Sequence, residues 1–299
     1  MPLFRLAHIS DPHLPPPPGA LGLRDLASKR ALSALAWRRK GLQHQPAILA
    51  ALVDDVAAYG PDHTVVTGDL TNYGTMVEFD AARRWLQGLG AAADVTVSPG
   101  NHDALVGSGA HARFAAWGDW LGDEAGEFPK VRRRGPLALV NLCSGRANAP
   151  LLASGRLGGD QLARLDSILA GLADERAFRV LALHHPPLKG VVSWRKALED
   201  GAALRRLLRA RGVDLVLHGH AHEAAVGVLD GPDGAIPVFG APSASAAPGG
   251  AHPAARWHGL EIDDAGAAPT VRIVARGFSA ETGLFEPLGS YVLASPRRR

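Results

Sequence analysis

Short apolar runs alternate with amphipathic stretches over the first two thirds of the chain. Each run ends at a polar residue or a glycine, which is typical of buried strands joined by short loops. The runs lie at residues 3–9, 63–67, 95–98, 137–142, 180–183 and 215–218. Helical patterns lie between several of them, at residues 46–59, 75–89, 159–172 and 196–211. This alternation predicts an α/β fold in layers.

The pattern changes after His222. Apolar segments separated by tight turns predict antiparallel hairpins there, with strands at 226–229, 237–239, 257–262 and 271–275. Residues 240–253 are rich in Ala, Ser and Pro and predict an exposed loop. No repeat and no long linker divides the chain, so we expect one domain over residues 1–299. It comprises a part with polar motifs at 11–222, a strand-rich part at 223–295 and an arginine tail at 296–299.

Composition narrows the class of protein. The 299 residues are 46% hydrophobic and 20% charged, as in ordinary globular chains. Cys143 is the only cysteine, which excludes an intramolecular disulfide, favours a buried apolar role for it and fits a reducing compartment. We therefore expect a cytoplasmic protein, and the early polar residues and lack of a long apolar run predict neither a signal peptide nor a membrane span. The net charge is +3, and the three C-terminal arginines account for all of it, so the rest of the chain is neutral. A neutral body argues against a broad nucleic-acid-binding face.

Five polar segments each follow a predicted strand. They are Asp11 with His13, Gly68-Asp69, Gly100 through Asp103, His184-His185, and Gly219 through His222. Carboxylate, imidazole and amide groups are ligands of divalent metals. Residues two apart in an extended strand point to one face, and the carboxyl ends of strands border the functional crevice of open α/β sheets. The glycines let the backbone approach a ligand closely. The sequence therefore predicts a metal site at the strand ends.

These segments resemble the calcineurin-like metallophosphoesterase superfamily. Its signature of D-x-H, G-D, G-N-H-D/E, H and G-H-x-H is present in order between residues 11 and 222. Residues 8–13, the run His184-His-Pro-Pro and Ser144-Gly-Arg146 are similar to the bacterial class III cyclic-nucleotide and glycerophosphodiester phosphodiesterases. The resemblance implies a four-layer α/β/β/α sandwich, with two mixed sheets face to face and helices outside.

The resemblance also implies two divalent metal ions, with Mn, Fe and Zn all compatible with these ligands. The implied ligands are Asp11, His13, Asp69 and His222 for the first ion, and Asp69, Asn101, His184 and His220 for the second. A hydroxide bridging the ions would attack the phosphodiester in line. The expected catalytic residues are His102, which would donate a hydrogen bond or a proton to the leaving alkoxide or to the phosphoryl group, and Asp103, which would orient His102. We expect substrate contacts from Asn72, Arg146 and His185, with a helix cap as the alternative for Asn72 and a place behind the ligands for His185.

Other polar residues receive structural interpretations. His8 and His218 are expected to pack beside the site, and the remaining histidines to be surface or structural residues: His44, His63, His111, His252 and His258. Residues 132–134 are expected to form a solvated turn. Residues 29–40 form a basic amphipathic helix with Trp37, for which four roles stay open: a solvated face, a cap over the site, a contact with anionic lipid, or a homodimer surface.

The function that we expect is hydrolysis of a small phosphodiester, either a 3′,5′-cyclic nucleotide or a glycerophosphodiester. The basic helix keeps a lipid-linked pyrophosphate or diester at a membrane surface as an alternative. A nuclease or protein phosphatase, and a metal-binding scaffold without catalysis, are further alternatives. Metal-dependent turnover separates the enzymes from the scaffold, and salt-dependent affinity for DNA would indicate a nuclease.

Overall fold

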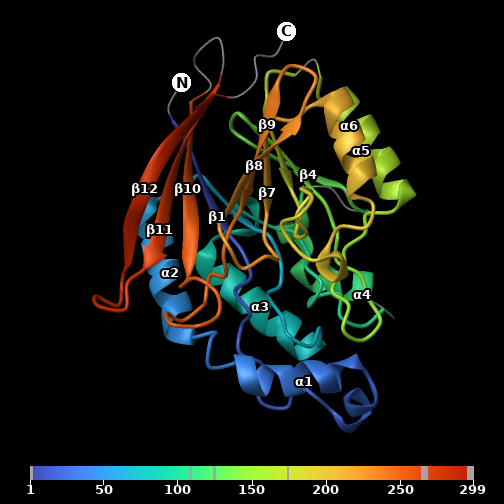
Figure 1. Cartoon of the computed structure of the whole chain (residues 1–299), viewed down its shortest axis with the longest axis vertical. Helices are drawn as coiled ribbons and strands as arrows, with labels where there is room; N and C mark the ends of the chain where they lie inside the picture. Colours follow the sequence, from blue (N-terminus) through green and yellow to red (C-terminus); the bar gives the residue numbers. More distant parts are fainter. Residues whose placement is uncertain (1–2, 108–109, 124–125, 174, 264–268, 295–299) are drawn as a thin grey trace.

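The computed structural model describes residues 3–107, 110–123, 126–173, 175–263 and 269–294. The predicted arginine tail at 296–299 and the side chain of His111 lie outside the described parts. Among the described residues, two six-stranded mixed sheets lie face to face with helices on their outer faces (Figure 1). This arrangement confirms the predicted four-layer sandwich.

The first sheet combines parallel strands from the start of the chain with antiparallel strands from its end. In spatial order its strands are β12 (Phe285–Ala294), β11 (Thr270–Phe278), β10 (Arg256–Asp263), β1 (Phe4–Ile9), β2 (His63–Val66) and β3 (Val95–Val97). Strand β1 pairs in parallel with β2, Leu6 opposite His63, and antiparallel with β10, Leu6 opposite Leu260. The ends of β1, β2 and β3 therefore meet at one edge of the sheet.

The second sheet has a parallel centre and an antiparallel hairpin on each side. In spatial order its strands are β4 (Lys130–Arg134), β5 (Leu137–Asn141), β6 (Phe178–Ala182), β7 (Leu215–His218), β9 (Ala235–Gly240) and β8 (Ala225–Asp230). Strands β6 and β7 are parallel neighbours, with Val180 opposite Leu215. The segments that follow them therefore leave the sheet at the same edge.

Three apolar clusters fill the three interfaces between the layers. One joins the first sheet to α2 (Pro46–Tyr59) and α3 (Met76–Leu89), and includes Leu52 and Phe79. Another joins the second sheet to α5 (Gly159–Gly171) and α6 (Gly201–Arg211), and includes Leu165 and Leu204. The third lies between the sheets and includes Leu6 from β1. Burial of this kind, at about 25 cal/mol per Å² of apolar surface, stabilises the sandwich.

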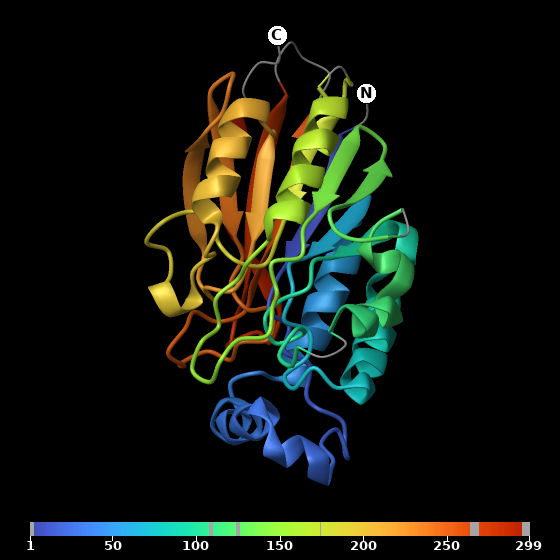
Figure 2. The same ribbon diagram turned by 90° about the vertical axis from the view of Figure 1, so that its right-hand side faces the viewer.

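A basic helix projects from this body. Helix α1 (Lys29–Lys40) follows the short helix η1 (Leu23–Ala27), and both lie at the end of the molecule opposite the start of β1 and the end of β12 (Figures 1 and 2). Arg30 connects α1 to the body, because its guanidinium donates to the carbonyls of Tyr73 (2.9 Å) and Gly74 (2.8 Å). We call residues 20–42 the basic flap. The remaining short helices are α4 (Ala110–Phe114), η2 (Ala92–Asp94), η3 (Ala115–Leu121) and η4 (Trp194–Lys196).

Two local expectations are wrong. Residues 132–134 lie in strand β4, and Arg132 is buried, since its guanidinium pairs with Asp123 at 2.5 Å. The loop that starts at Gly240 is buried over residues 241–246 and becomes exposed only at 248–251. Ser243 explains this burial, because its hydroxyl donates to the carbonyl of Asp11 at 2.7 Å and holds the loop under the polar end of the sheets.

Candidate metal centre

The predicted ligands gather at one end of both sheets. Asp11 and His13 follow β1, Asp69 follows β2, and Asn101 follows β3. His184 follows β6, while His220 and His222 follow β7. Each sheet thus supplies part of one site, because the strands that precede these residues end at the same side of the sandwich.

Backbone geometry sets these residues apart. Among the described residues other than glycine, six have a positive φ angle; five of them are predicted ligands, and the sixth is Leu151. The five ligands are Asp11 (50°), His13 (42°), Asp69 (56°), His220 (69°) and His222 (56°). The left-handed region costs a residue with a side chain of the order of 1 kcal/mol and is concentrated at functional sites. The backbone is therefore strained at these positions, and the strained conformation directs the side chains toward a common point.

Close backbone approach accounts for the glycines in the motifs. A Cβ atom on Gly100 would lie 2.2 Å from Asp69 Oδ1, and one on Gly219 would lie 1.7 Å from Ser10 Oγ. Gly68 has a φ of 92° and would place a Cβ 2.7 Å from the amide nitrogen of Gly100. The predicted need for glycine before Asp69, Asn101 and His220 therefore has a direct steric cause.

The first group of ligands surrounds Asp11. Its Oδ1 lies 3.2 Å from His222 Nε2 and 3.9 Å from His13 Nε2, while Oδ2 accepts from the amide of His220 at 2.9 Å. The Nε2 atoms of His13 and His222 are 3.3 Å apart. Burial by itself would raise the pKa of Asp11, but the contact with His222 and the nearby His184 together outweigh burial and hold that pKa well below its usual value.

The second group surrounds His184. Its Nε2 lies 3.1 Å from Asn101 Oδ1, 3.1 Å from His220 Nδ1 and 3.3 Å from Asp69 Oδ2. Its Nδ1 donates to the carbonyl of Thr67 at 2.7 Å, which directs Nε2 toward the site. Burial opposes charging of this ring, yet the Asp69 carboxylate raises the pKa of His184 to about 9. The carboxylates around His184 therefore favour positive charge at Nε2, which a bound cation would supply in place of a proton.

These donors fit divalent cations. Asp11 Oδ1 and His220 Nε2 are buried, and within the described parts of the chain neither has a hydrogen-bond partner. Ligating atoms of three sets of side chains lie within 4.8 Å of one another: His13 with His44 and His222, His184 with His185 and His220, and Asp11 with Asp69 and His184. Buried carboxylates and imidazole lone pairs that converge in this way are stabilised by cations.

The predicted catalytic pair is arranged differently from the expectation. His102 donates from its amide to Asp69 Oδ1 at 2.8 Å, and its Nδ1 lies 3.1 Å from the Asn72 carbonyl. The Asn72 carbonyl therefore orients His102, whereas Asp103 was expected to do so. Asp103 is buried and accepts from the amides of Asp69, Gly100 and Thr71, each at 2.9 Å. Burial and the neighbouring Asp69 charge raise the pKa of Asp103 to about 6. It holds the two ligand loops together.

The three expected substrate contacts lie in different settings. Asn72 lines the cavity described below, but its Oδ1 lies 3.1 Å from His13 Nδ1, and Thr75 caps the following helix in its place. Both ring nitrogens of His185 are occupied, by Ser144 Oγ (2.8 Å) and the Ala153 carbonyl (3.1 Å), which places His185 behind His184. Arg146 pairs with Glu199 at 2.7 Å and does not line the cavity.

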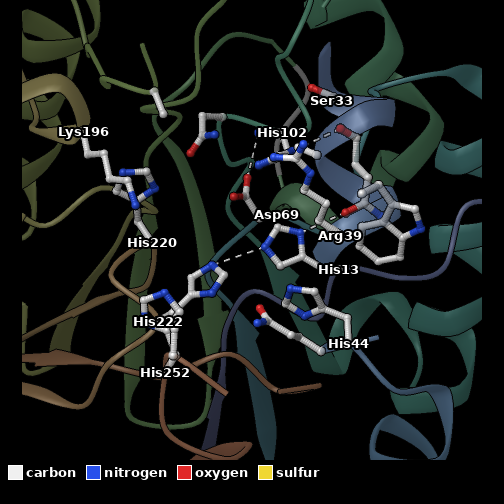
Figure 3. A pocket seen from close by; sticks show the side chains of 17 residues that line it. His13, Ser33, Arg39, His44, Asp69, His102, Lys196, His220, His222 and His252 are labelled. Carbon is white, nitrogen blue, oxygen red and sulfur yellow. Dashed lines mark hydrogen bonds between the residues drawn. The ribbon is translucent and has the colours of Figure 1, made fainter. Parts of the chain in front are cut away.

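A cavity of about 410 Å³ opens over these ligands. Figure 3 shows His13 and His222 pointing toward each other, with Arg39 and Ser33 entering from the side of α1 and Lys196 from the opposite side. Asp69 is the only acidic residue in the described lining, whereas Arg39, Lys196 and six histidines also line it. The cavity is therefore suited to an anionic ligand.

The comparisons with known proteins agree with this geometry. A family model for the calcineurin-like phosphoesterases matches residues 4–224, well over half of the chain. The chain belongs to the calcineurin-like phosphoesterase family. All the predicted ligands lie inside the matched residues.

Two curated relatives are bacterial proteins of this kind. A probable cyclic nucleotide phosphodiesterase of Synechococcus is 29% identical over 180 residues, which cover 59% of this chain and 64% of the relative. A cAMP/cGMP dual specificity phosphodiesterase of Mycobacterium tuberculosis is 31% identical over 166 residues, which cover 54% of this chain and 49% of the relative. This calcineurin-like chain thus spans less than two thirds of the length of either relative.

Solved structures share the fold. A purple acid phosphatase from yellow lupin (Lupinus luteus) gives a TM-score of 0.64 at 12% identity, covering 98% of this chain and 54% of that one. A dimetal phosphatase from Danio rerio gives a TM-score of 0.55 at 15% identity, covering 98% of this chain and 99% of that one. At such low identity the likeness shows the fold of this calcineurin-like chain and nothing finer.

Two histidines of the site were expected to be surface or structural residues. His44 is only 7% exposed and lines the cavity, and its ring stacks on Trp37 with centroids 5.7 Å apart. His44 Nδ1 lies 2.8 Å from Ser245 Oγ, in the loop that was expected to be exposed. His252 lines the cavity as well. Neither follows a predicted strand within a motif, so only the high count of 13 histidines indicated them.

Proposed function

We propose that this protein is a phosphodiesterase that uses two divalent metal ions to hydrolyse a small phosphodiester, either a 3′,5′-cyclic nucleotide or a glycerophosphodiester. The observation that carries the proposal is the convergence of the seven predicted ligands at one end of both sheets, where five of them line a cavity that also contains Arg39 and Lys196. The names of the two curated relatives support a cyclic nucleotide as the first substrate to test.

The residues divide into two sets that share Asp69. Asp11, His13, Asp69 and His222 would hold one ion, and Asp69, Asn101, His184 and His220 would hold the other. The distances around Asp11 Oδ1 and around His184 Nε2 support this division. When bound, two such ions supply neutralisation of the phosphate charge and activation of a water molecule at neutral pH.

His102 is the proposed proton donor to the leaving oxygen. Its Nδ1 is held by the Asn72 carbonyl at 3.1 Å, and the residue lines the cavity beside Asp69. A protonated imidazole donates from both ring nitrogens, so Nε2 would donate to the substrate while Nδ1 keeps its contact with the carbonyl. General acid assistance of this kind contributes on the order of 10²- to 10⁴-fold.

We propose that Asn72 positions both a metal ligand, His13, and the proton donor, His102. Its side-chain Oδ1 fixes the tautomer of His13, and its Nδ2 donates to the Leu14 carbonyl at 2.7 Å. Its backbone carbonyl orients His102. Asn72 would thus keep a metal ligand and the proton donor in register.

Hydrolysis of bis-p-nitrophenyl phosphate by protein loaded with Mn²⁺ tests the proposal, followed by a panel with 3′,5′-cAMP, 3′,5′-cGMP and a glycerophosphodiester. We expect His102→Ala to retain both ions and to lower kcat on the order of 10²- to 10⁴-fold. We expect Asp69→Asn to lose metal together with activity. Protein that holds two ions and hydrolyses no diester would contradict the proposal. The alternative of a metal-binding scaffold without catalysis would then remain.

A further inference from the structure

Large apolar side chains are exposed on three segments that contribute residues to the cavity lining. On the basic flap, Leu23 is 89% exposed, Leu42 83%, Leu35 53% and Leu32 49%. On the other two segments, Leu151 is 84% exposed and Trp194 74%. We call these six side chains the rim. Single exposed leucines are ordinary on a protein surface, but a group of them beside one cavity indicates an interaction surface.

Hydrogen bonds hold the parts of the rim together. Lys29 Nζ donates to the Leu152 carbonyl at 2.9 Å, which joins the flap to the loop of Leu151. The amide of Ala153 donates to the Arg195 carbonyl at 2.9 Å, which joins that loop to the segment of Trp194. Ala153 lines the same cavity as Arg39 of the flap. All three segments that carry the rim therefore supply residues to the cavity lining, which include Arg39, Ala153 and Lys196.

The charge around the rim is predominantly positive. Residues 20–42, 149–153 and 193–196 contain eight Lys and Arg residues and a single acid, Asp25. Asp25 is already paired with Arg30 at 2.6 Å. Arg195 lies over the Trp194 ring, 5.4 Å from its centroid. Surfaces that bind an anionic lipid interface typically combine exposed leucine and tryptophan side chains with basic residues.

We propose that the rim docks on an anionic phospholipid bilayer. The exposed leucines and Trp194 would enter the boundary between headgroups and acyl chains, and Arg24 and Arg38, both exposed, would face the lipid phosphates. A second copy of this chain fits less well, because a symmetric dimer through the rim would bring two basic surfaces together. Within the described parts, no helix has the length and apolar character needed to cross a bilayer.

The flap geometry suits such a contact. Leu32, Leu35 and Arg39 are spaced i, i+3 and i+7, so they share one face of α1. Arg39 and Ala36 line the cavity, and Leu32 and Leu35 are exposed beside them. Figure 2 shows the flap projecting beyond the ends of the sheets. Docking would bring the cavity mouth to the lipid interface.

Co-sedimentation with vesicles tests this inference without turnover, so its outcome is separate from that of the proposed function. We expect binding to vesicles of phosphatidylglycerol and phosphatidylcholine, and little binding to phosphatidylcholine alone. Leu32→Ser/Leu35→Ser and Trp194→Ser should each weaken binding about tenfold or more, because they remove apolar surface that would be buried. Arg24→Glu/Arg38→Glu should weaken it about tenfold or more at low salt, since each basic residue near an anionic surface contributes about fivefold.

Matched variants separate docking from general surface effects. Val226→Ser/Val228→Ser removes two exposed apolar residues (63% and 64%) from β8, and Arg206→Glu reverses an exposed charge on α6. Both controls should bind vesicles like the wild type, and all variants should keep the wild-type Tm and the wild-type rate on bis-p-nitrophenyl phosphate. The inference is overturned if the wild type ignores anionic vesicles or if the controls lose binding equally. The inference is also overturned if sedimentation velocity shows that the wild type is a dimer and that Leu32→Ser/Leu35→Ser is a monomer. That result would indicate that the rim binds a second copy of the chain.

Discussion

Strained ligand residues persist because hydrogen bonds hold the loops on both sides. The amide of Asp11 donates to the Gly68 carbonyl at 3.1 Å, and that of His13 donates to the Asp69 carbonyl at 3.0 Å. The Asp103 carboxylate accepts from the amides of Asp69 and Gly100 and so connects the two loops that carry them. Such over-determined loops keep ligand atoms in place before any ion arrives.

Gly100→Ala tests this rigidity. The new Cβ would lie 2.2 Å from Asp69 Oδ1, so the Asp69 side chain, which is proposed to bind both ions, has to move. We expect a loss of bound metal and a free energy of unfolding lower by about 1–3 kcal/mol. Metal analysis and urea denaturation measure the two effects.

Gly88→Ala is the control for that substitution. No atom lies within 4 Å of its added Cβ, and Gly88 is inside helix α3. We expect unchanged metal content and a gain in stability of up to about 1 kcal/mol from helix propensity. Wild-type metal content in Gly100→Ala would contradict the steric argument.

Residue types and order were sufficient to predict which side chains meet. The motifs place Asp11, His184 and the other ligands after strands, and strand ends are fixed by the buried pattern. His44 and His252 could not be found in this way, because their positions depend on irregular loops. The role of Asp103 was also misplaced, since the sequence does not show that the Asn72 carbonyl is nearer to His102.

At the scale of elements, helix α3 joins the core to the site. Thr75 and Glu78 form a capping box, and Glu78 is only 3% exposed. The Glu78 carboxylate accepts from the amides of Asn72 (2.9 Å), Tyr73 (3.0 Å) and Thr75 (3.1 Å). The start of this helix therefore sets the position of Asn72, on which His13 and His102 depend.

Glu78→Gln replaces one acceptor oxygen by an amide group that faces buried N–H donors. We expect the free energy of unfolding to fall by about 1–3 kcal/mol, since a buried donor loses its partner. We also expect a lower kcat, because Asn72 loses its anchor. Thermal denaturation and diester hydrolysis measure these effects, and Asp80→Asn, an exposed change on the same helix, should alter neither.

Elements with a strong period were predicted closely, and elements fixed by tertiary contacts were not. The helix at 46–59 has the predicted bounds, because Pro46 begins it and Gly60 ends it with a φ of 65°. Strand β4 was mistaken for a turn, because its run of arginines indicated exposure to solvent. Arg132 is nevertheless buried, and its guanidinium pairs with Asp123. Helix α6 begins at Gly201 instead of 196, because the preceding residues bridge to Gly155 through Leu198.

At the scale of the whole molecule, the two sheets are joined by the site as well as by their apolar interface. Asp11 and Asp69 come from the first sheet, and His184, His220 and His222 come from the second. Cations bound between them would therefore connect both halves of the sandwich. The four layers followed from the sequence only through the family resemblance, because alternating strands and helices do not specify how many sheets form.

Metal binding should consequently stabilise the fold. Ligand at 100 times its Kd contributes about 2.7 kcal/mol. For a chain of this length, that corresponds to a rise in Tm of roughly 4 °C. Differential scanning calorimetry of chelated and Mn²⁺-loaded protein measures the rise. His102→Ala should keep it and Asp69→Asn should lose it, whereas equal Tm values for chelated and loaded wild type would speak against a site that bridges the sheets.

Anomalous diffraction from crystals soaked in Mn²⁺ tests the central claim most directly. We predict two anomalous peaks in the cavity, with Asp69 bound to both, Asp11, His13 and His222 around one, and Asn101, His184 and His220 around the other. A single peak, or a peak held by His13, His44 and His222 with Asp69 left out, would contradict the account.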